Sequence, residues 1–144
     1  MQKIYIIEHL EKEVFPWCLI EYKNISKIVG KENLWFCNLN GIKGTENLFS
    51  LGKCIKESVR KLALKNACVL DPDAKKTLSP EESKKLQYFI FGGILGDYPP
   101  RKRTKKELSS FLPDVSKYNI GKGQMSTDNA VYVVKQIIKG KKLN

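Results

Sequence analysis

Five short apolar runs, separated by longer stretches of helical or polar pattern, constrain the fold of this chain more than any other feature. Runs of this length, rich in β-branched and aromatic residues, are typical of strands in a buried sheet. Because they alternate with helical segments, they predict an α/β fold: a parallel sheet with helices on both faces and right-handed crossovers. The predicted strands are residues 3–8, 34–37, 67–70, 88–91 and 115–120.

Local signals mark where several helices begin and end. Pro16 suits a first helical turn and Gly30 a helix stop. Ser79, followed by Pro80 and Glu82, forms a capping box that starts a short helix. The other predicted helices are residues 15–29, a less regular basic segment at 47–65, residues 105–112 and residues 126–140. The basic side of residues 47–65 is either solvated surface or a binding site.

The stretch 88–104 combines features that a generic loop does not need. A buried strand runs into Gly92, Gly93 and Gly96, where backbone can approach a ligand closely. Asp97, a Pro-Pro turn and the basic residues Arg101 and Arg103 follow. Since ligands bind at the carboxyl ends of strands in open α/β sheets, we expect a site here. The two arginines either solvate the loop or hold a phosphate or an acidic partner group.

A second glycine-containing loop follows the last predicted strand. Residues 121–128 contain two glycines and then three good N-cap residues, so a helix start there offers backbone N–H groups to an anion. Two such loops would form a pocket built mainly of backbone, which suits a nucleoside. The Walker A and dinucleotide-binding glycine patterns and the nucleophile elbow are absent, which disfavours those classes.

Ionisable side chains stand at several predicted strand ends. Glu8, Asp71 and Asp97 would lie on one side of the sheet, with Asp71 held extended before Pro72 and projecting beside Glu8 and the glycines. His9 is either a ligand-site residue or a loop residue with local hydrogen bonds. Asp97 could instead cap its own loop.

Charge and cysteine content restrict the partners and the compartment. The net charge is +11, of which +8 falls on residues 98–144. This field either attracts RNA or an RNA-rich particle, or is a solvated lysine-rich surface. The four cysteines form no close pair, so we expect buried thiols in a reducing compartment and no metal site. No apolar run is long enough to cross a membrane, and we expect a cytoplasmic protein.

Several of these segments together resemble a known family, the SPOUT-class methyltransferases whose eukaryotic member methylates an arginine of a small-subunit ribosomal protein. The resemblance covers nearly the whole chain, and the glycine block is its most specific part. The matching segments are Ile6-Ile7-Glu8-His9, Glu21-Tyr22, Leu70-Asp71-Pro72, residues 88–97 with Pro99-Pro100-Arg101 and Arg103-Thr104, and Gln124-Met125-Ser126-Thr127-Asp128.

The resemblance implies a fold, a cofactor and a set of site residues. The fold is a parallel sheet with a C-terminal trefoil knot, and the cofactor is S-adenosylmethionine in a bent conformation. An arginine acceptor would also need carboxylates that orient its guanidinium, and the candidates are Glu8, Asp71 and Asp97. We expect Asp97 and Glu8 to hold it and Arg101 and Arg103 to contact the partner. The cofactor-binding residues would be Leu70, Asp71, Pro72, Phe91, Gly92, Gly93, Ile94, Gly96, Asp97, Ile120, Gly121, Gln124, Met125, Ser126 and Thr127.

Three functions remain open from the sequence. The first is a protein-arginine methyltransferase acting on a ribosomal protein, and the second is a methyltransferase of ribosomal RNA in the same knotted class. The third is a non-catalytic RNA-binding module. Lys102 stands between the two arginines where the family has an acidic residue. This difference concerns the identity of the acceptor and not the binding of the cofactor. We expect a monomer, although many SPOUT enzymes are dimers.

Overall fold

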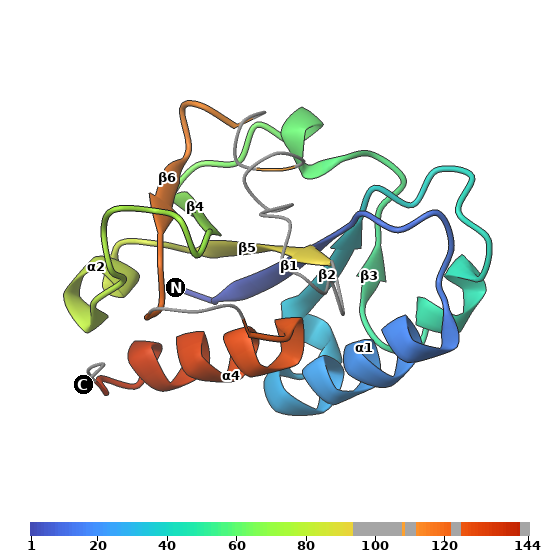
Figure 1. Ribbon diagram of the computed structural model, residues 1–144, viewed down its shortest axis with the longest axis horizontal. Coiled ribbons are helices and arrows are strands. Elements are labelled where there is room, and N and C mark those ends of the chain that lie inside the picture. Colours follow the sequence, from blue (N-terminus) through green and yellow to red (C-terminus); the bar gives the residue numbers. More distant parts are fainter. Residues whose placement is uncertain (94–107, 109–111, 122–124, 142–144) are drawn as a thin grey trace.

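The computed structural model describes residues 1–93, 108, 112–121 and 125–141. Its strands form a six-stranded sheet of order β3-β2-β1-β5-β4-β6, in which every described pair is parallel (Figure 1). The predicted α/β fold with a parallel sheet is confirmed. The strands are β1 Ile4–His9, β2 Leu34–Cys37, β3 Lys53–Cys54, β4 Ala67–Leu70, β5 Tyr88–Gly93 and β6 Ser116–Tyr118.

Three α-helices are described: α1 and α4 pack against one face of the sheet, and α2 lies beside α4 (Figure 1). Among the described residues the predicted helices on the other face are not seen, because the segment between β3 and β4 covers that face. Their starts follow the local signals: Pro16 lies in the first turn of α1, and the Ser79 hydroxyl accepts the Glu82 N–H at 3.1 Å in front of α2. The helices are α1 Pro16–Val29, α2 Pro80–Lys84 and α4 Thr127–Ile138, and short 3₁₀ turns are η1 Lys31–Asn33, η2 Thr45–Leu48 and η3 Val59–Lys61.

The sheet has a hydrophobic core on each face. Strand β1 is buried along its whole length, as a central parallel strand must be. Tyr5 and Ile7 pack toward the helices, whereas Ile4 and Ile6 pack toward the opposite face. That second core is completed by the segment between β3 and β4 and by three residues near β6, namely Leu108, Leu112 and Val115. Residues 53–66 therefore cover part of the sheet face opposite the helices.

The helix predicted over residues 47–65 is wrong. The segment instead contains the end of η2, the strand β3 and the turn η3. A Cβ on Gly52 would lie only 2.5 Å from the Leu34 carbonyl oxygen, so the chain passes too close to β2 for a side chain there. Pairing of β3 with β2 thus overrides the weak helical pattern.

Other predictions fall partly or wholly outside the described residues. The helix over residues 105–112 does so except at Leu108 and Leu112, and so does part of the segment in which the resemblance implies a trefoil knot. The four cysteines are unpaired, and three of them are buried. Among the described residues there is no cluster of potential metal ligands and no helix with the length and apolarity to span a membrane.

Candidate active site

The carboxyl ends of β1 and β5 lie side by side and bring the first two predicted site segments together. Glu8 is paired in register with Gly92, and His9 with Gly93. Strand β4 lies on the other side of β5 and ends at the same edge of the sheet. Because parallel strands share their carboxyl edge, the sheet gathers the glycines and the segment after β4 as predicted.

The segments 70–72 and 118–121 are joined directly by hydrogen bonds. Leu70 is in register with Tyr118, and the Asp71 N–H donates to the Tyr118 carbonyl at 2.9 Å. Asn119 then links the two loops, since its amide donates to the Ala74 carbonyl at 2.8 Å and its side-chain oxygen accepts the Gly121 N–H at 3.1 Å. Two of the segments expected to cradle the cofactor therefore form one rigid unit.

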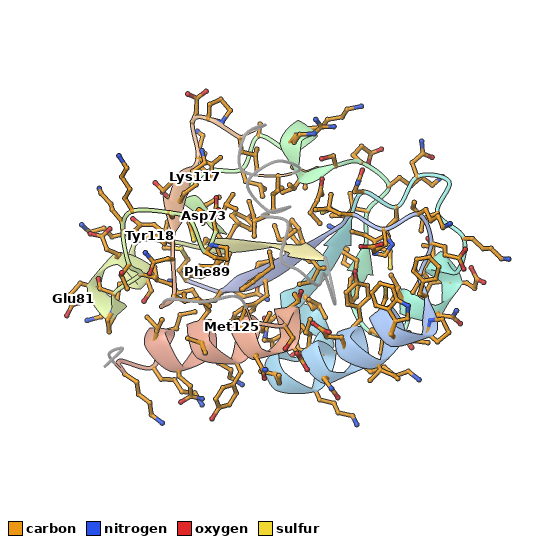
Figure 2. All side chains as sticks on the ribbon, viewed as in Figure 1. Asp73, Glu81, Phe89, Lys117, Tyr118 and Met125 are labelled. Atoms are coloured by element: carbon orange, nitrogen blue, oxygen red, sulfur yellow. The ribbon has the colours of Figure 1, made fainter. Side chains whose placement is uncertain are left out.

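The start of α4 lies beside the end of β5. The Thr127 hydroxyl donates to the Gly92 carbonyl at 3.3 Å, across 35 residues of sequence. Met125 lies just before the helix, where its side chain is partly exposed (Figure 2). Residues 125–127 are thus beside Gly92, as the resemblance implies for a cofactor-binding loop.

Glu21 was part of the family resemblance but was given no role from the sequence. Its carboxylate, on α1, accepts the Asp128 N–H at 3.1 Å, at the first turn of α4. The Ser126 side chain does not cap this helix and donates instead to the Asp128 carboxylate at 2.7 Å. Burial, with a smaller contribution from the nearby Asp128 carboxylate, raises the pKa of Glu21. No sequence spacing could pair Glu21 with a residue so distant.

Glu8 is at the predicted place, but its carboxylate is held by the protein itself. One oxygen accepts the Val59 N–H at 2.9 Å and the other accepts the Ser58 hydroxyl, so Glu8 ties η3 to the sheet. Burial raises the pKa of Glu8, against the opposing effects of these two hydrogen bonds and of Arg60. That Glu8 orients the acceptor arginine stays a prediction.

His9 has a structural role in a buried hydrogen-bond chain. Its Nε2 lies 3.0 Å from the Glu13 carbonyl, which can only accept, so Nε2 carries the proton. Its Nδ1 therefore accepts the Tyr22 hydroxyl at 2.7 Å. Burial lowers the pKa of His9, which favours this neutral form.

Asp71 lies at the predicted edge, but strand β5 separates it from Glu8. Two strand spacings place the two backbones about 10 Å apart, so Asp71 does not project beside Glu8 as predicted. Its carboxylate accepts the Asp73 N–H at 2.9 Å and closes a local turn.

Six predicted site residues lie outside the described residues: Ile94, Gly96, Asp97, Arg101, Arg103 and Gln124. Their roles stay predictions. Among the remaining site residues, Gly92, Gly93 and Gly121 have no side chain. Gly121 has a φ of +110°, and a Cβ added to it would meet no described atom within 4 Å. Glycines at these positions suit a nucleoside held by backbone amides and carbonyls.

This sheet, with residues 70–72, 92–93, 120–121 and 125–127 at its carboxyl edge, is the fold of a SPOUT-class methyltransferase. The particular family follows from direct comparison. Residues 4–144 match the family described as protein arginine N-methyltransferase SFM1-like, and the chain belongs to that family.

Relatives with known names agree with this assignment. The chain is 38% identical over 150 residues to protein arginine N-methyltransferase SFM1 of Saccharomyces cerevisiae, covering 94% of this chain and 70% of the yeast protein. The yeast SFM1 structure with SAM matches with a TM-score of 0.86 and 36% identity over 96% of this chain and 69% of that one. The structure with SAH matches with a TM-score of 0.85 and 36% identity over 94% and 71%.

A more distant match shows the fold alone. Trm10 of Thermococcus kodakaraensis, described as dual specific, superimposes with a TM-score of 0.71 at 17% identity, covering 97% of this chain and 94% of that one.

Proposed function

We propose that this protein is an S-adenosylmethionine-dependent methyltransferase that modifies an arginine side chain of a protein. The observation that carries the proposal is the 38% identity to an arginine methyltransferase across 94% of the chain. The described edge of the sheet supports it, because the segments implied for the cofactor converge there through the Asp71–Tyr118 and Thr127–Gly92 hydrogen bonds.

The protein's task in such a reaction is mainly alignment. S-adenosylmethionine, when bound, supplies a methyl group that is already activated on sulfur. Residues 70–72, 91–93 and 120–127 would hold it, and the contact of Glu21 with α4 would fix the last of these segments. The acceptor guanidinium is protonated at neutral pH, so it needs a carboxylate that orients it and takes up a proton as it reacts. We assign this task to Asp97, and Glu8 stays the second carboxylate predicted from the sequence.

A small-subunit ribosomal protein is the acceptor that we propose, in the cytoplasm and with the enzyme as a monomer. The net charge of +11 supports it, because a basic enzyme is attracted to a particle rich in RNA. Arg101 and Arg103 would contact the partner.

Transfer of a labelled methyl group to intact small subunits tests the proposal. We expect protease, and not nuclease, to release the label. Acid hydrolysis of the labelled protein should yield labelled methylarginine. The Asp97→Asn variant should transfer the methyl group far more slowly than the wild type, even at saturating S-adenosylmethionine. Full activity of that variant would remove Asp97 from the mechanism, and label that follows nuclease would replace the protein acceptor with RNA.

RNA methylation is the second candidate, because +8 of the net charge lies in residues 98–144. The same digestion experiment separates the two. A non-catalytic RNA-binding module is the third, and calorimetric titration with S-adenosylmethionine tests it. The enzyme should give saturable heat at one site per chain, whereas a module that only kept the fold should give none.

A further inference from the structure

A strongly basic segment crosses the face of the sheet opposite the helices, from β3 past the end of β1 to the start of β4. Residues 53–65 contain five basic side chains and one acidic one, a net charge of +4. All five basic residues are exposed: Lys53, Lys56, Arg60, Lys61 and Lys65. Since the segment is not the helix that its sequence suggested, its basic side chains are displayed by an irregular backbone.

That backbone is fixed rather than loose. The Lys56 carbonyl accepts the N–H groups of Leu39 and Asn40 at 3.1 Å each, and the Glu57 carbonyl accepts the Asn38 N–H at 2.8 Å. Val59 is buried in the second core, where Leu62 and Leu64 pack against the sheet. The apolar side chains therefore face inward and the basic ones outward, which gives a preformed positive surface.

The middle of this surface lies next to the proposed site. Glu8 binds Ser58 and Val59, and Glu8 is in register with Gly92 on the neighbouring strand. Neighbouring strands are about 4.8 Å apart. Residues 58–59, which bind the Glu8 side chain, therefore lie within roughly 10 Å of the end of β5. A large acceptor particle that reaches the site would therefore meet these cations as well.

We infer that residues 53–65 are a docking surface for RNA phosphates, by which the enzyme holds the RNA of its acceptor particle while an arginine occupies the site. The inference deepens the proposed function and rests on it. RNA phosphates need only well-placed cations, whereas a protein partner needs apolar anchors. Among the described residues, the large exposed hydrophobic side chains all lie outside this segment.

The chain offers a matched control for this surface. Lys23, Lys27 and Lys31 are also exposed, but they belong to α1 and the turn after it, on the helix-covered face. Replacing them with glutamine removes the same charge as Lys56→Gln, Lys61→Gln and Lys65→Gln. A third variant with the latter three lysines changed to arginine keeps the charge and tests whether the side chains themselves are needed.

Binding of a fluorescent RNA hairpin, measured by anisotropy, is the first readout. We expect the 56/61/65 glutamine variant to bind about tenfold more weakly at low salt and its slope of log K against log salt to be smaller by about 2. The arginine variant and the α1 control should bind like the wild type. The inference would be overturned if both glutamine variants lost RNA affinity equally, or if the wild type did not bind RNA. It would also be overturned if the wild type bound polyglutamate more tightly than RNA.

Methyl transfer is the second readout and separates this inference from the proposed function. With intact small subunits, the glutamine variant should have a KM raised about tenfold at unchanged kcat, consistent with the loss of phosphate contacts. With an RNA-free arginine peptide it should equal the wild type, and a loss there would overturn the inference. A wild type that methylates neither acceptor would refute the proposed function, and the anisotropy measurement alone would then decide on RNA docking.

Discussion

The end of β1 and the start of α4 lie at the same edge of the sheet, but their polar groups are used differently. At the end of β1, the side chains of Glu8 and His9 form hydrogen bonds with other groups of the protein. At the start of α4, Thr127 and Glu21 contact or fix the segments implied for the cofactor. Polar residues after a buried strand are therefore an ambiguous sign of catalysis, because the loop that follows also needs anchors. Changes at β1 should affect stability, and changes at α4 should affect cofactor binding.

Glu8 should give the largest effect. The Glu8→Ala variant leaves the Ser58 hydroxyl and the Val59 N–H without their buried acceptor, which should lower the free energy of unfolding by about 3 kcal/mol. Urea denaturation measures this loss. Glu8→Gln retains one acceptor oxygen and should cost less. A stable Glu8→Ala protein that binds cofactor but transfers no methyl group would instead place Glu8 in the reaction.

Tyr22→Phe should come next, because it removes the donor to His9 Nδ1 in a fully buried position. We expect a loss of about 1.5 kcal/mol in the free energy of unfolding. The Kd for S-adenosylmethionine should not change. A raised Kd at unchanged stability would show that the β1 end takes part in cofactor binding.

The pH dependence of stability should reveal the same hydrogen-bond chain. The pKa of folded His9 is lower than its ordinary value of 6.5, so the unfolded chain takes up the proton first. The stabilising contribution of neutral His9 is complete above pH 6.5 and decreases as the pH falls through the pKa of the folded protein. A His9→Gln variant should lack this part of the acid destabilisation in urea titrations at several pH values. An unchanged profile would contradict the assignment.

Glu21→Ala tests the other side of the comparison. Loss of the acceptor for the Asp128 N–H should cost about 1 kcal/mol of stability. If cofactor binding must then order the start of α4, the Kd for S-adenosylmethionine should rise about fivefold. Glu21→Gln, whose carbonyl oxygen can accept the same N–H, should restore most of the affinity in calorimetric titrations. Equal weakening in both variants would mean that charge, rather than position, matters.

Thr127→Val should have the smallest effect. The substitution keeps the shape and removes the hydroxyl, which donates to the Gly92 carbonyl at 3.3 Å and also hydrogen-bonds Glu21. The Gly92 bond is worth about 0.5 kcal/mol. We expect about a twofold rise in the Kd for S-adenosylmethionine with little change in urea stability. Thr127→Ser keeps the hydroxyl and serves as the control. A valine variant with lower stability and unchanged Kd would remove the contrast between the two regions.

Much of the fold could be predicted because its signals are local. The runs at β1, β2, β4 and β5 were identified correctly, and so were the starts of α1 and α2 at Pro16 and Ser79. The helix predicted over residues 47–65 failed because pairing of β3 with β2 depends on a close approach between Gly52 and Leu34. Such a contact leaves no mark in the spacing of one segment.

The sequence by itself determined the alternation of strands and helices, the strand at residues 88–91 with the glycines after it, and the resemblance to its family, since these depend on residues close together in the chain. Only the tertiary structure decided that Glu8 binds Ser58 and Val59, that Glu21 fixes the start of α4 and that the basic segment 53–65 crosses the sheet face opposite the helices and passes the end of β1. These contacts join residues 50, 51 and 107 positions apart. The order of the strands sets such distances, and local propensity does not encode that order.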